Sequence, residues 1–85
     1  MYIIKLVKRA PGLDDRYIMS MGPRQIRTIG VFEFACYPLR DGMKTFKSPA
    51  AALAMLARYG YTDADGNPLA RLTAAGVTAV EIIPA

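Results

Sequence analysis

Apolar and polar side chains alternate along the first half of the chain in the manner of β-strands. Residues 2–9 have apolar side chains on both alternating faces, which is typical of a strand in the middle of a sheet. Residues 16–21 repeat the alternation after a turn rich in Pro, Gly and Asp, so we expect an antiparallel hairpin. Residues 25–37 are rich in β-branched and aromatic side chains. We expect them to form one strand bent at Gly30, or two short ones.

The second half carries the start and stop signals of helices. Ser48 can accept a backbone N–H as an N-cap, and the proline after it suits the first helical position, so a main helix is predicted at residues 49–59. Gly60 is a natural residue just past its end. Asn67 and the next proline repeat the same order, which predicts a short second helix at residues 68–75.

Two further strands complete the predicted fold. Residues 43–47 are expected to form a short return strand, and residues 77–83 a last strand that pairs into the sheet. A chain of 85 residues is too short to build two cores, so we expect one domain, residues 1–85. The order of elements predicts an α+β fold, in which a mostly antiparallel sheet of four to five strands carries both helices on one face.

The composition excludes several kinds of chemistry. The chain has no His and a single Cys, so it cannot form a disulfide framework, a Cys/His zinc site or a His-based acid–base pair. The segment Asp63–Asn67 has carboxylates at alternate positions, but Gly66 and Ala74 do not match a calcium loop, so we expect a turn. We therefore predict a protein that is not an enzyme and needs no cofactor or metal.

Basic residues are concentrated in the first part of the chain. Residues 1–48 contain nine Lys and Arg against four Asp and Glu, whereas residues 49–85 contain two against three. The whole chain has a formal net charge of +4. Five of these cations flank predicted turns, and we expect them to form one exposed binding cluster. They are Arg24, Arg27, Arg40, Lys44 and Lys47.

Two kinds of partner fit such a cluster. An acidic protein surface would be attracted by the cations and anchored by Arg58, Tyr59 and Tyr61, at the end of the main helix. The alanine-rich flank of that helix could also pair with a second copy of the chain. Alternatively, Arg24, Arg27, Lys44 and Lys47 would bind nucleic-acid phosphates, and exposed aromatic residues of the 25–37 segment would stack on bases.

In size and layout the chain resembles small accessory proteins of phages and mobile elements, including the anti-CRISPR group. The resemblance implies a single α+β domain without catalytic residues that inhibits a host defence complex by occupying its surface. Many members of that group are acidic and imitate DNA, which this basic chain cannot do by charge. No apolar run is long enough to span a bilayer and no signal peptide is recognised, so we expect a cytoplasmic protein with no membrane partner.

Overall fold

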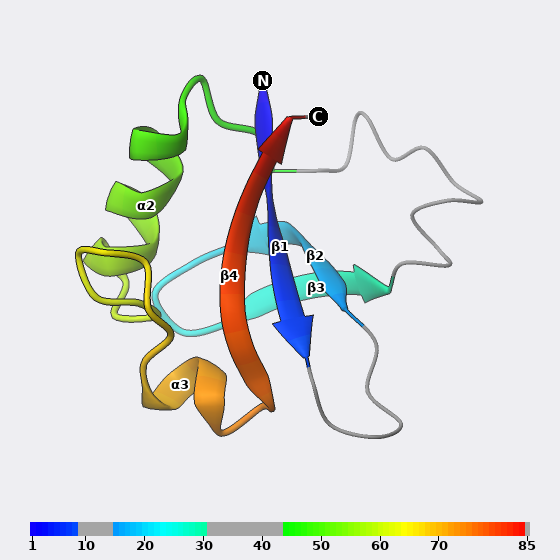
Figure 1. Ribbon diagram of the computed structural model, residues 1–85, viewed down its shortest axis with the longest axis vertical. Coiled ribbons are helices and arrows are strands. Elements are labelled where there is room, and N and C mark those ends of the chain that lie inside the picture. Colours follow the sequence, from blue (N-terminus) through cyan, green and yellow to red (C-terminus); the bar gives the residue numbers. More distant parts are fainter. Residues whose placement is uncertain (9–14, 31–43, 85) are drawn as a thin grey trace.

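An antiparallel sheet with strand order β3-β2-β1-β4 lies at the centre of the computed structural model, which describes residues 1–8, 15–30 and 44–84 (Figure 1). The described strands and helices are β1 (Tyr2–Lys8), β2 (Arg16–Met21), β3 (Ile26–Gly30), α2 (Pro49–Arg58), α3 (Ala70–Thr73) and β4 (Val77–Pro84). The predicted α+β fold with one main helix is confirmed, as are the central position of β1 and its antiparallel pairing with β2. Within the described residues, no helix is long and apolar enough to cross a membrane.

The two faces of the sheet bury separate clusters of side chains. Ile4 and Leu6 of β1 lie in the main core, together with buried residues of both helices. Ile3 points to the opposite face, where it packs with Tyr17 and Ile29 in a smaller cluster. Because successive side chains of a strand alternate between faces, β1 serves both clusters, which explains its apolar pattern on both sides.

An irregularity in the hairpin of β2 and β3 changes which side chains share a face. The sequence pattern places Tyr17, Met19 and Met21 on one face, and this is wrong for Met21. The pairing register shifts between Ile18 and Ser20, so the extra residue reverses the alternation beyond it. Met21 therefore packs against the main core, while Tyr17 and Met19 belong to the smaller cluster.

Helix α2 begins at the predicted residue and ends at Arg58, one residue before the predicted end. The Ser48 Oγ accepts a hydrogen bond from the Ala51 backbone N–H at 3.2 Å, and the proline occupies the first turn. Gly60 adopts φ of 76°, a left-handed conformation that favours glycine and that ends the helix. Ala52 and Leu56 are completely buried, so this face of α2 holds the helix against the sheet.

Helix α3 is shorter than predicted and begins later. Asn67 does not cap it, because its side-chain amide donates to Asp63 Oδ2 at 3.1 Å. The following residue, Pro68, instead forms an isolated bridge with Thr62. Leu69 stands at the start of α3 without a side-chain cap, so the proline belongs to the loop and not to the first turn.

Asp63 organises the loop between α2 and α3. One carboxylate oxygen accepts the backbone N–H groups of Asp65 and Asn67 at 2.9 and 3.0 Å. These bonds, led by the one from Asn67, lower the pKa of Asp63 below its ordinary value of 3.8, because they favour the charged form. The segment Asp63–Asn67 is thus a turn, as expected, and its backbone N–H groups bond to the carboxylate of its first residue. Across the described residues no group of three or more His, Cys, Asp or Glu could hold a metal.

The pKa of Asp63 gives an expected pH dependence. A carboxyl whose pKa is lower in the folded state stabilises the fold above its ordinary value of 3.8, and this contribution is lost as pH falls through the folded value. Asp63→Asn should therefore lower the free energy of unfolding at neutral pH. It should also make that free energy fall less between neutral pH and a pH below 3.8, as measured by urea unfolding at the two pH values. Asp65→Asn is the control, because the Asp65 side chain accepts none of these bonds. An unchanged acid-induced fall in Asp63→Asn would contradict the role of Asp63.

The remaining strand predictions are met only in part. Residue Phe46, in the predicted return strand 43–47, forms a single bridge with Tyr2, with two backbone hydrogen bonds of 2.9 Å. Of the predicted strand 25–37, the described part is β3. Residues 31–43 lie outside the described part of the chain.

Candidate functional site

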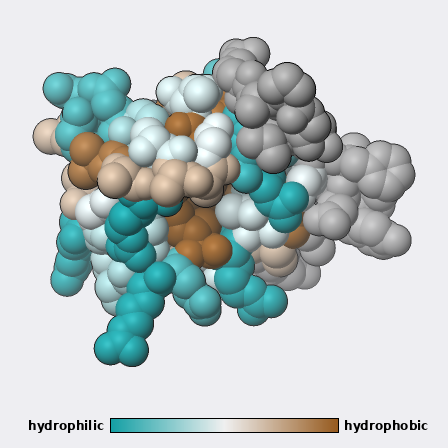
Figure 2. All heavy atoms as spheres, turned by 90° about the horizontal axis from the view of Figure 1, so that it is seen from below, coloured by the Kyte–Doolittle hydropathy of each residue, from teal (hydrophilic) through white to brown (hydrophobic). Residues whose placement is uncertain are grey.

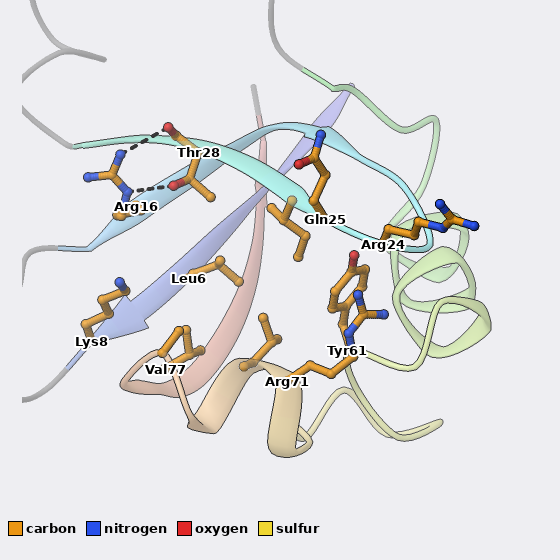
Figure 3. A pocket seen from close by; sticks show the side chains of 12 residues that line it. Leu6, Lys8, Arg16, Arg24, Gln25, Thr28, Tyr61, Arg71 and Val77 are labelled. Carbon is orange, nitrogen blue, oxygen red and sulfur yellow. Dashed lines mark hydrogen bonds between the residues drawn. The ribbon is translucent and has the colours of Figure 1, made fainter.

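A cavity of about 400 Å³ opens between the helix-covered face of the sheet and α3 (Figure 3). Its lining combines an apolar floor with a cationic rim. The apolar floor consists of Leu6, Ile26, Leu72, Ala75 and Val77. The cationic rim consists of Lys8, Arg16, Arg24 and Arg71. None of the described residues that line the cavity is acidic, so the cavity presents an apolar surface surrounded by positive charge.

Strand periodicity places two of the rim residues. Lys8 follows Leu6 by two positions in β1, so both side chains lie on the face that carries the main core. Arg16 precedes Ile18 by two positions in β2, and Ile18 is also in the main core. Each cation therefore continues an apolar row at the end of a strand.

Arg16 is held against the neighbouring strand. Its Nε donates to Thr28 Oγ1 at 2.6 Å, and its NH2 group donates to the Thr28 carbonyl oxygen at 3.0 Å. Figure 3 shows both bonds along one edge of the guanidinium. The side chain is thus ordered before any partner binds, which reduces the entropy that binding must remove.

Arg71 is fixed on the other side of the cavity by Tyr61. Its guanidinium lies 4.1 Å from the centre of the Tyr61 ring, within the range of a cation–π contact. Its NH1 group donates to the Tyr59 carbonyl oxygen at 2.8 Å. The Tyr61 hydroxyl in turn donates to the Gly22 carbonyl oxygen, which fixes the β2–β3 turn beside the end of α2. Arg24 leaves from that turn and points outward in Figure 3.

The rim side chains form no ion pair with a described carboxylate, although Asp15 Oδ1 accepts the backbone N–H of Lys8 at 3.0 Å. Lys5 points to the opposite face of β1 and forms ion pairs with Asp15 at 3.4 Å and Glu81 at 3.9 Å. Within residues 1–8, 15–30 and 44–84, the ion pairs all involve Lys5. Within the described part of the chain, the positive charge of the cationic rim is therefore not engaged in side-chain ion pairs. Figure 2 views the molecule from the end where α3 lies, with apolar atoms at the centre of this face between projecting hydrophilic side chains.

The predicted basic cluster is divided by the structure. Arg24 lines the cavity, but Arg27 alternates with Ile26 and Thr28 in β3 and so lies on the opposite face. Lys44 and Lys47 do not line the cavity: they flank Phe46, which bridges Tyr2 at the start of β1. Lys44 stands over the ring of Phe46, with Nζ 5.7 Å from the ring centre. Arg40 lies outside the described residues, as do the aromatic residues predicted to stack on bases.

The predicted anchors at the end of α2 have different environments. Arg58 is exposed in the last turn, and Tyr59 is half-buried with its ring edge-on to Tyr61. Tyr61 is only 3% exposed, so it cannot be a projecting anchor: it is buried because its ring supports Arg71 and its hydroxyl reaches Gly22. Ala50 and Ala54 on the outer flank of α2 are exposed.

Three residues of the cationic rim were not among the predicted site residues. Lys8 and Arg16 could have been found by extending the apolar face of their strands by two positions. Arg71 carried no such signal, because it comes from the second half of the chain and reaches the cavity only through its contact with Tyr61.

Searches with the sequence and with the structure find no matching family model, no matching curated protein and no matching solved structure. The chemistry of the cavity is therefore the basis for assigning a function.

Proposed function

We propose that the protein is a non-catalytic binding domain that takes an acidic, partly apolar segment of a protein partner into the cavity. The observation that carries the proposal is a cationic rim around an apolar floor, in which the rim side chains form no ion pair with a described carboxylate. Carboxylates of the partner would meet Lys8, Arg16, Arg24 and Arg71, and an apolar side chain between them would cover the floor. Charge complementarity accelerates the encounter, and burial of the apolar side chain supplies affinity.

The nature of the floor favours a protein segment over a nucleic acid. The accessible part of the floor is aliphatic, because it is formed by the half-buried Ile26 and the exposed Ala75. Leu6, Leu72 and Val77 lie beneath it and are at most 4% exposed. Such a surface suits a Leu, Ile or Val side chain. Single-stranded nucleic acids bind by stacking bases on exposed aromatic rings. Among the described residues that line the cavity, the one aromatic ring is that of Tyr61, which is 3% exposed and has Arg71 over its face. Base stacking is therefore not available there.

The resemblance in size and layout to phage accessory proteins supports a mode of action for such a domain. In this part of the proposal, the protein comes from a phage or mobile element and binds an acidic surface on a defence complex of the host cell. The bound protein covers a surface that the complex needs for its activity. The inhibition is steric, so no reaction and no cofactor are required.

Three labelled probes test the proposed partner chemistry by fluorescence anisotropy. One peptide alternates Glu and Leu, the second alternates Glu and Ser, and the third probe is an oligothymidylate of the same total charge. We expect the Glu–Leu peptide to bind roughly tenfold or more tightly than the Glu–Ser peptide, because burying one leucine is worth about 1.5–3 kcal/mol. Equal binding of the two peptides would show a surface that recognises charge alone. Tightest binding of the oligothymidylate would favour a nucleic-acid partner instead.

A further inference from the structure

The last strand, β4, forms an edge of the sheet whose outer side is unpaired within the described residues. The strand order leaves β4 with one neighbour, β1, and the backbone hydrogen bonds found outside helices and strands do not involve it. From Ala79 to Pro84 the register with β1 is uninterrupted. A row of backbone N–H and C=O groups at alternate residues is therefore free to pair with another strand.

This edge lacks the features that usually prevent pairing between molecules. Natural edge strands are protected by lysines, by internal prolines or by bulges. The sequence of β4, VTAVEIIP, contains no Lys, and its one Pro is at the end. The register shift lies at the other end, opposite Val7 and Lys8. Its single charge, Glu81, is shared with Lys5 of the neighbouring strand, so the edge is also almost neutral.

Apolar side chains border this edge on both faces of the sheet. Val80 and Ile82 are half-buried against the main core, and Ile83 is half-buried against the smaller cluster on the other face. A strand added beside β4 must therefore supply apolar residues on both of its faces to cover them. An acidic segment of the kind proposed for the cavity does not meet this requirement, whereas a second β4 does.

We propose that β4 pairs with β4 of a second copy of the chain, in an antiparallel arrangement around a two-fold axis. Such an arrangement is self-complementary, so one contact satisfies both unpaired edges at once and joins the two sheets into one. None of the rim residues is on β4: Lys8 is on β1 and Arg16 on β2, and β4 contributes to the cavity only Val77, at the start of the strand. The dimer contact therefore stands independently of the function proposed for the cavity.

The mass of the protein in solution tests the dimer. Sedimentation velocity in the high-micromolar range should give twice the 9.3 kDa of one chain. A single 9.3 kDa species at every concentration would overturn the proposal. In the dimer, all amides of the β4 segment Ala79–Ile83 should be protected from hydrogen exchange, and on dilution the outward-facing alternate set should exchange rapidly. This second measurement uses the unmodified protein and so does not depend on a variant that folds.

A matched pair of lysine substitutions locates the contact. Thr78→Lys adds a charge at an exposed position of β4 and removes a hydroxyl that donates to the Val7 carbonyl oxygen. Thr73→Lys makes the same change at the exposed end of α3, where the lost hydroxyl donates to the Ala70 carbonyl oxygen. We expect Thr78→Lys to weaken the dimer roughly tenfold or more and Thr73→Lys to leave it within about twofold. Equal weakening by both would overturn the placement on β4. A third variant, Ala54→Glu, tests the alanine flank of α2. If it lost the dimer while Thr78→Lys kept it, the contact would lie on α2, and the proposed pairing of β4 would be overturned.

Discussion

Leu56→Ala is expected to lower the free energy of unfolding by about 2–5 kcal/mol, measured by urea denaturation. Leu56 is completely buried and is the larger of the two buried side chains by which α2 packs into the main core. Its truncation removes apolar burial and leaves a cavity that the surrounding residues fill only in part. A domain of this size is stable by only about 4–13 kcal/mol, so the substitution removes a large share of the total.

The control for this effect is the same substitution at an exposed leucine. Leu69 is 41% exposed at the start of α3, and Leu69→Ala should cost less than about 1 kcal/mol. If the two variants lost the same stability, α2 would not be anchored through Leu56. The expected order reflects the depth of burial, since the chemical change is identical.

Ala75→Glu is expected to weaken binding of the Glu–Leu peptide by roughly tenfold or more, about 1.4 kcal/mol. Ala75 is exposed and lines the cavity, so the new carboxylate stands beside the cationic rim. It competes with the carboxylates of the peptide for those cations and covers part of the apolar floor. Because Ala75 is not buried, the fold should tolerate the change.

A neighbouring position provides a close control. Ala74→Glu introduces the same charge one residue earlier, at the exposed C-terminal end of α3, but Ala74 does not line the cavity. Both variants have the same net charge, so long-range attraction changes equally in the two. We expect Ala74→Glu to bind the peptide within about twofold of the native protein. Equal losses in the two variants would show that the peptide responds to overall charge and not to the cavity.

The fold was predictable where local signals and tertiary packing agree. The cap of Ser48 and the left-handed Gly60 delimit α2 by backbone chemistry that acts within a few residues. The same reasoning failed at Asn67, because the Asp63 carboxylate competes for the side chain that the cap would need. Met21 was misplaced because no local feature of the sequence marks the bulge after Ile18.

The candidate site was less predictable, since it depends on contacts between distant segments. Counting charge along the chain pointed to the first half and identified Arg24, but it could not place Arg27 on the opposite face. The contact of Arg71 with Tyr61 forms only when α3 folds back toward the β2–β3 turn. The distribution of charge between the two faces also depends on strand pairing, because the pairing of β1 with β4 brings Glu81 beside Lys5. The composition suggested a cationic binding surface, and the topology determines which cations form it.

The most direct measurement is a titration of the native protein with the Glu–Leu peptide, followed by the NMR signals of its methyl groups. Binding in the cavity predicts saturable shifts of the Ile26 and Ala75 methyls, which form the accessible part of the apolar floor, with Ala50 and Ala54 on the outer flank of α2 unaffected. Shifts confined to the α2 alanines, with the Ile26 and Ala75 methyls unmoved at saturation, would contradict the assignment of the cavity as the binding site.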